Sequence, residues 1–336
     1  MTRRARRATW AVAVLLAIFL VGTFTLIHKN DDFPTGQAGP RVDISVSSGA
    51  TGSAIASLLA KAGVVKSATR FVAEELKNPK SQGISPGIHS IESHVPSSLA
   101  LSEMLDPKFV RGLIRVGEAS TVQDVLSALK SAPTISFNYT PQATFKLPAF
   151  VPTKSLEGIL APADYAFANG TTATTALQSM IEKFSQNVGS DGLLAGFEKY
   201  NAYQVLTVAS MIQIEGDPVD YPKVAAVIYN RLRIGMALQL NSTVQYAAHL
   251  RGKIALSSSA TQIASPYNTY RNVGLPPTPI SNPSLAAISA ALHPASGDWL
   301  YFITVQPHDT RFTNSYPEFE AWVSLYNKYL RAGAFK

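Results

Sequence analysis

The feature that most restricts the fold of this 336-residue chain is an apolar segment that ends in one acidic residue. Residues 203–215 read YQVLTVASMIQIE and are followed by Gly216-Asp217-Pro218. The apolar side chains cover most of a helix circumference, which is typical of a helix buried on all sides. Gly216 suits the position after a helix end, and Pro218 prevents the helix from continuing. We therefore predict a buried helix over residues 203–215.

Glu215, the last residue of this segment, is the only charged residue between Tyr200 and Gly216. Burial disfavours a charged carboxylate, and the partial negative charge at a helix C-terminus does so too. Both effects raise the pKa of the carboxyl group, which is what a general acid working near neutral pH needs. The alternative is a glutamate that simply reaches solvent at the end of its helix.

The composition excludes several classes of protein. The chain has no cysteine, so disulfide scaffolds, cysteine-ligated zinc, iron–sulfur clusters and thiol nucleophiles are ruled out. The six histidines show no metal-ligand spacing, and no nucleotide-binding or serine-hydrolase motif occurs, so we predict no metal and no cofactor. Arg3, Arg4, Arg6 and Arg7 supply four of the seven net positive charges. Because this excess is confined to one cluster, we predict no nucleic-acid partner.

An uncharged run of 19 residues, 9–27, follows the arginine cluster and reads TWAVAVLLAIFLVGTFTLI. About 20 apolar residues span a bilayer. Residues 1–28 are therefore expected to form a cytoplasmic arginine cluster and a single transmembrane anchor, which places the protein in the cell membrane with most of the chain outside the cytoplasm. The alternative is a cleaved signal peptide, but its apolar run would be shorter and end in small residues.

The rest of the chain predicts an α+β fold in two parts after a polar linker at residues 29–41. Residues 42–154 are expected to form a small α+β module of strand–helix units, and residues 155–336 a second α+β domain. In the second part we predict a helix over 221–234, an extended run over 237–247, a helix over 282–293, a strand over 299–305 and a helix over 317–331.

A proline-rich segment from Ser265 reads SPYNTYRNVGLPPTPISNP and predicts a stiff, ordered loop. Tyrosine rings stack on sugar faces and amides bind hydroxyl and N-acetyl groups, so Tyr267, Asn268 and Tyr270 are candidate ligands for a sugar. The alternative is a surface loop whose tyrosines only pack. His293 and His308 are candidate catalytic partners, although a lone histidine at a helix end before proline is more often structural.

Taken in order, four segments resemble the endolytic murein transglycosylases of the MltG (YceG-like) family. They are ASMIQIEG, VAAVIYNRLRIGMALQLNSTVQYA, SPYNTYRNVGLPPTPISNP and ALHPASGDWLYFITV. The segment SLEGILAPADYAF, from Ser155, resembles a further family element. The segment GATGSAIASLLAKAGVVKSATRF resembles the LysM-like part that precedes the catalytic domain. The resemblance covers roughly residues 42–330.

This resemblance implies a lytic transglycosylase that cuts peptidoglycan strands internally, between N-acetylmuramic acid and N-acetylglucosamine, and leaves 1,6-anhydro-muramoyl ends. It implies that Glu215 is the catalytic acid and then base. It also implies that Asn230, Gln239, Tyr267, Asn268 and Tyr270 line the glycan groove. Association with peptidoglycan synthases is an expectation at the level of the family.

The chain departs from the family pattern at several positions. Asn241-Ser242 stands where members often have Asp-Pro, and Gln213 stands where many have a second acid. Ala161 and Ala163-Asp164 weaken another match, and Thr310 replaces a common histidine.

Two other functions remain open at this point. A hydrolytic muramidase would need a second carboxylate near Glu215, for which Asp217 and Asp220 are candidates. A non-catalytic peptidoglycan-binding scaffold is the other alternative, although a scaffold has no reason to bury an acid at this position.

Overall fold

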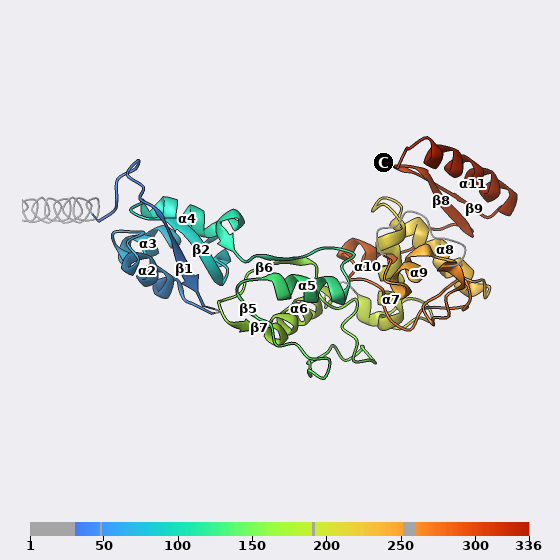
Figure 1. Cartoon of the computed structure of the whole chain (residues 1–336), viewed down its shortest axis with the longest axis horizontal. Coiled ribbons are helices and arrows are strands. Elements are labelled where there is room, and N and C mark those ends of the chain that lie inside the picture. Colours follow the sequence, from blue (N-terminus) through green and yellow to red (C-terminus); the bar gives the residue numbers. More distant parts are fainter. Residues whose placement is uncertain (1–30, 48, 190–191, 251–259, 336) are drawn as a thin grey trace, which may run out of the picture. The chain divides into compact units, whose positions relative to one another are not determined.

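The computed structural model describes residues 31–47, 49–189, 192–250 and 260–335, which form two compact units (Figure 1). The first unit contains the described residues up to Ile114, together with Ala132–Ser136 and Tyr165–Thr171. The second contains Arg115–Ser131, Phe137–Asp164 and the described residues from Thr172 onward. Each unit mixes helices with small sheets, so the predicted α+β class is confirmed.

The described part of the structure does not bear out the predicted membrane localisation. In the part of the chain that the structure describes, no helix is long and apolar enough to cross a bilayer. Apolar helices such as α7 (Ala202–Glu215) and α10 (Leu285–Leu292) have 14 and 8 residues, whereas a span needs about 20. The predicted anchor, residues 9–27, lies outside the described residues.

The first unit is a small sheet covered by helices (Figure 1, blue to cyan). Strand β2 (Gly87–Glu92) pairs antiparallel with both β1 (Arg41–Val46) and β3 (Val110–Arg111). The helices are α2 (Gly52–Lys61), α3 (Ala68–Glu75) and α4 (Ser97–Leu105), with short 3₁₀ turns at Ser81–Gly83 and Pro107–Phe109. A two-stranded ladder pairs β5 (Ile135–Ser136) with β7 (Thr171–Thr172).

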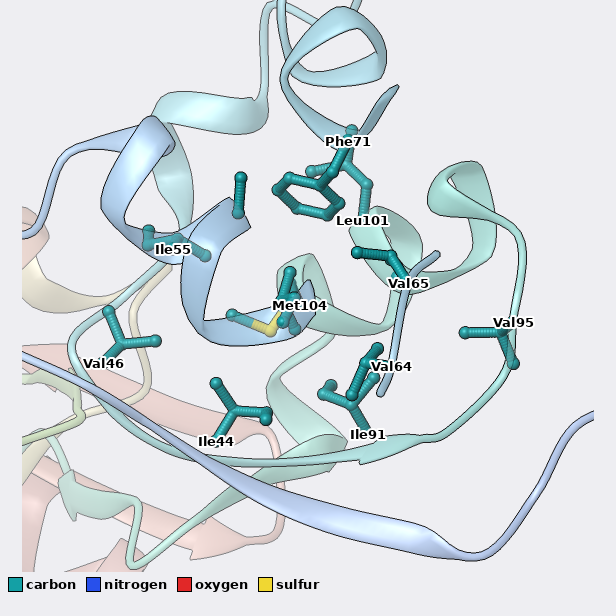
Figure 2. Packing of buried hydrophobic residues seen from close by; sticks show 13 residues of the cluster. Ile44, Val46, Ile55, Val64, Val65, Phe71, Ile91, Val95, Leu101 and Met104 are labelled. Atoms are coloured by element: carbon teal, nitrogen blue, oxygen red, sulfur yellow. The ribbon is translucent and has the colours of Figure 1, made fainter. Parts of the chain in front are cut away.

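Side chains from both layers fill the core of the first unit (Figure 2). Alternate residues of β1, Ile44 and Val46, point inward, as the period of two in a strand requires. Phe71 of α3 is completely buried in this core. In α2, Leu59 is buried, whereas its neighbour Leu58 is 39% exposed.

The second unit is built around α7, which packs against α8 (Tyr221–Arg233), α9 (Asn241–Ala247) and α10. Asn201 and Gln204 form a capping box that fixes the start of α7. Thr207 and Ser210 lie in the buried part of this helix, and their hydroxyls donate to carbonyl oxygens of the preceding turn. The prediction of a buried helix is confirmed over most of its length.

The remaining elements of the second unit lie before and after this helical centre. They are β4 (Ile114–Val116) paired with β6 (Ala163–Tyr165), α5 (Val122–Ser131), α6 (Ala173–Val188), 3₁₀ turns at Leu193–Ala195 and Ala260–Gln262, β8 (Tyr301–Gln306) paired with β9 (Asp309–Thr313), and α11 (Tyr316–Arg331). α11 packs on β8 (Figure 1, red).

One local prediction about the second unit is wrong. The run 237–247 was expected to be extended throughout, but residues from Asn241 onward form α9. Ser242, Thr243 and Val244 are buried at successive positions, which a strand with one open face could not achieve. Gly216 directly follows the last residue of α7, as predicted, with a φ of −138°. A Cβ at this position would lie 3.1 Å from Val224 Cγ2, which is a tight contact.

We expect Phe71→Ala to lower the free energy of unfolding by about 3–5 kcal/mol, because it leaves a cavity in a closed core. Phe71→Leu fills more of the space and should cost less. Urea unfolding, with hydrogen exchange to locate the loss in the first unit, measures both effects. Equal unfolding midpoints for wild type and Phe71→Ala would contradict the packing described here.

Candidate active site

Glu215 ends α7 beside the first turn of α9. The backbone N–H of Ser242 donates to Glu215 Oε1 over 3.0 Å. The residue is half-buried. Burial of the carboxyl group raises its pKa, while contacts with Ser242 and the positive charge of Arg231 oppose that rise. The net effect is a pKa above the ordinary value, which favours the protonated acid as predicted from the sequence.

Arg231 of α8 is the buried cation of this region, with 7% of its surface exposed. Its Nε donates to the carbonyl of Leu300 and its Nη1 to the carbonyl of Leu238, both over 2.6 Å. Its guanidinium carbon lies 5.3 Å from the ring centre of Tyr301. Burial lowers the pKa of Arg231, and the negative charges of neighbouring groups, Glu215 among them, partly restore it. Arg231 therefore joins the acid, the loop before α9 and strand β8.

Glu215 and Arg231 line a pocket of about 460 Å³ within the second unit. The polar wall of the pocket contains Glu215, Gln239, Asn241 and Tyr270. A second group of lining residues, which we call the aromatic wall, consists of Tyr301, Tyr316, Phe319, Tyr326 and Phe335. Of the described residues that line the pocket, Glu215 alone carries a carboxylate.

Two of the predicted glycan ligands lie in this pocket. Gln239 is exposed at the wall with a left-handed φ of 50°, an unusual conformation for a residue with a side chain. Its backbone is held by a hydrogen bond from its N–H to the carbonyl of Thr269 over 3.0 Å. The hydroxyl of Tyr270 donates to Asn241 Oδ1 over 2.7 Å. Burial and then the charge of Glu215 raise the pKa of Tyr270.

The three other predicted ligands do not line this pocket. The amide of Asn230 donates to the carbonyls of Gly297 and Trp299, over 3.0 and 2.9 Å. Asn268 is fully buried, and its amide donates to the carbonyls of Thr261 and Ile263.

Tyr267, the third of these residues, bonds to Thr278 through its hydroxyl, with 3.0 Å between the two oxygens. Its ring packs against Tyr246 at a centroid distance of 5.0 Å. The polar groups of Asn230, Tyr267 and Asn268 thus hold loops of the second unit in place.

The candidate catalytic partners also lie outside the pocket lining. Asp217 Oδ2 pairs with His308 Nδ1 over 3.0 Å on the surface. Asp220 precedes α8, and the exposed His293 follows α10.

Sequence reasoning missed Arg231, Ser242 and the aromatic wall. Arg231 continues the buried face of α8 one turn after Val227 and Ile228, whereas Arg233 falls on the opposite face, so helical periodicity could have separated the buried arginine from the exposed one. The aromatic residues of 301–335 were visible, but were taken only as parts of a strand and a helix. The departure at Asn241-Ser242 was the one signal for Ser242, because a proline at that position would have no N–H to donate.

The fold and the pocket define a two-unit α+β protein with a buried-acid pocket, and sequence comparison places it. A profile of the YceG-like family matches residues 44–324. The chain therefore belongs to the YceG-like family, as the sequence motifs predicted.

Named relatives extend this assignment. The chain is 30% identical over 303 residues to a Bacillus subtilis protein named endolytic murein transglycosylase. The alignment covers 82% of each of the two chains. A Streptococcus pneumoniae protein of the same name is 36% identical over 153 residues, which are 44% of this chain and 28% of that protein.

A solved structure supports the fold alone. The crystal structure of a yceG-like protein from Listeria monocytogenes aligns with a TM-score of 0.53 at 24% identity. The alignment covers 84% of this chain and 99% of the other.

We expect Ser242→Pro to raise the pKa of Glu215 further, because it removes a hydrogen bond that favours the carboxylate. Proline is tolerated in the first turn of a helix, so α9 should persist. Ser242→Ala removes the hydroxyl and keeps the N–H, so the difference between the two variants isolates the N–H. Carbon-13 NMR titration of labelled glutamate measures it, and equal values in both variants would contradict the assigned bond.

The raised pKa of Glu215 also predicts a stability effect. The folded state holds the proton more tightly than the unfolded state, so stability is lost as pH rises above the unfolded pKa. Glu215→Gln cannot ionise and should be more stable than wild type at pH 7, with a difference that shrinks toward pH 4. Urea unfolding at both pH values measures this, and a difference that grows toward pH 4 would reverse the sign we assign.

Proposed function

We propose that this chain is an endolytic murein transglycosylase, a lyase that cleaves peptidoglycan glycan strands internally. The observation that carries the proposal is the lone carboxyl group, raised in pKa, in a pocket whose described lining holds no second carboxylate. The names of the Bacillus and Streptococcus relatives point to the same activity.

A single carboxyl group is sufficient for the reaction we propose. Protonated Glu215 gives its proton to the glycosidic oxygen between N-acetylmuramic acid and N-acetylglucosamine, and the bond from that oxygen to the anomeric carbon breaks. The muramic 6-hydroxyl oxygen attacks the anomeric carbon and passes its proton to the Glu215 carboxylate. The products are a 1,6-anhydro-muramoyl end and a free 4-hydroxyl, and Glu215 is protonated again.

The surroundings of Glu215 fit both of its roles. Burial favours the neutral acid before the first proton transfer. The Ser242 N–H and the charge of Arg231 then limit the cost of the carboxylate that forms. Since the attacking group belongs to the substrate, no carboxylate is needed to activate water.

We further propose that Gln239 and Tyr270 contact the glycan, because both line the pocket with Glu215. The loops around the groove are held in place by the contacts described above for Asn230, Tyr267 and Asn268. The LysM-like assignment of residues 42–154, the catalytic assignment of residues 155–336 and association with peptidoglycan synthases remain proposals from the family resemblance.

Mass spectrometry of peptidoglycan digested by the purified chain tests the activity. Wild type should yield internal fragments with 1,6-anhydro ends, and Glu215→Gln should reduce the rate at least about 100-fold, the usual scale for a general acid. Asp217→Asn is the matched control, because Asp217 is a nearby carboxylate outside the pocket, and it should retain activity.

Other products would contradict the proposal in distinct ways. Reducing ends in place of anhydro ends would indicate a hydrolase. Their loss in Asp217→Asn would identify the second carboxylate. No product from wild type, with retained binding to peptidoglycan, would indicate a scaffold.

A further inference from the structure

The aromatic wall is left open by the rest of the fold. α11 carries five aromatic residues and has no fully buried residue. Tyr316 is 52% exposed. Aromatic side chains supply much of the burial in a domain core, so a helix this rich in them would ordinarily cover them. The residues of the aromatic wall instead face the pocket that contains Glu215.

The rings of the aromatic wall contact one another in the absence of a ligand. Tyr301 and Phe319 stack with centroids 5.2 Å apart and an angle of 26° between their planes. Tyr316 lies 5.6 Å from Tyr301 and 6.4 Å from Phe319. The guanidinium of Arg231 packs near the Tyr301 ring and ties it to the acid side of the pocket. A surface ordered in this way loses little conformational entropy on binding.

The lining of the pocket is therefore amphipathic. Some of its residues offer carboxyl, amide and hydroxyl groups, and the aromatic wall offers rings. A ligand that fits both needs an apolar face and a polar edge. A pyranose ring has both, because its C–H groups form a flat apolar face and its hydroxyl and N-acetyl groups project from the edge. Pockets of this kind bind their ligands mainly by apolar contact, and a few polar groups orient the ligand.

We propose that the aromatic wall is a saccharide-stacking subsite in which Tyr316 and Phe319 pack against the C–H face of one pyranose ring of the strand. The polar wall contacts the polar edge of the bound strand. This inference rests on the proposed function for the identity of the sugar polymer. It adds the residues that bind the strand next to Glu215.

The test compares variants of the full chain on glycan strands stripped of their peptide stems. Tyr316→Ala removes an exposed ring and should raise KM about fivefold to tenfold while changing kcat little, which corresponds to about 1–1.4 kcal/mol of binding. Tyr316→Phe keeps the ring and should match wild type. Tyr329→Ala, on the same helix and outside the pocket lining, should also match wild type.

A binding assay separates this inference from the proposed function. Sedimentation of Glu215→Gln with insoluble sacculi, with and without Tyr316→Ala, reports affinity without cleavage. Weaker binding in the double variant supports the subsite even if wild type cleaves nothing. Phe319→Leu, which keeps an apolar side chain, should weaken binding in the same direction, and circular dichroism checks that each variant is folded.

Three results would overturn the inference. Unchanged KM and affinity in Tyr316→Ala would mean that the wall does not touch the strand. An equal loss in Tyr316→Phe would assign the effect to the hydroxyl and not to stacking. A loss seen only with strands that carry peptide stems would place a peptide on the wall in place of a sugar.

Discussion

The organisation of the second unit depends on one buried charge. Arg231 lies inside the protein, where an unpaired cation would be costly, and the backbone carbonyls of Ala237, Leu238 and Leu300 accept its hydrogen bonds. Those carbonyls belong to two segments that approach α8 from different parts of the sequence. Because the guanidinium must be satisfied by both, the loop before α9 and the strand β8 are held at fixed positions. Residues of both segments line the pocket, together with residues of α7 and α11.

Burial, then Ser242, and then the same charge set the pKa of Glu215. Burial alone would keep this acid protonated and would oppose any step that leaves it ionised. Arg231 and the Ser242 N–H reduce that opposition without abolishing it. A group that must give and then recover a proton needs this intermediate environment, because either extreme would block one of the two transfers.

The sequence predicted the centre of the site better than its walls. Residues 203–215 could form little but a buried helix, so both α7 and the unusual acid at its end could be predicted. Loop residues were harder to interpret. Asn268 looked like a sugar ligand because an amide can bind hydroxyl groups, yet the same amide serves the backbone carbonyls of its own loop. The conformation of the loop decides whether the amide binds a ligand or a backbone carbonyl, and that conformation cannot be predicted from the sequence.

Glu215 and the residues of the aromatic wall are synthesised at different times. A chain is synthesised from its N-terminus, and domains fold largely as units as they emerge. α7 and Glu215 leave the ribosome well before β8 and α11, which supply the wall. A nascent or prematurely shortened chain would therefore carry the acid without the surface that we propose grips the strand. Glu215 is therefore synthesised first, and the aromatic wall that we propose binds the glycan strand is synthesised last.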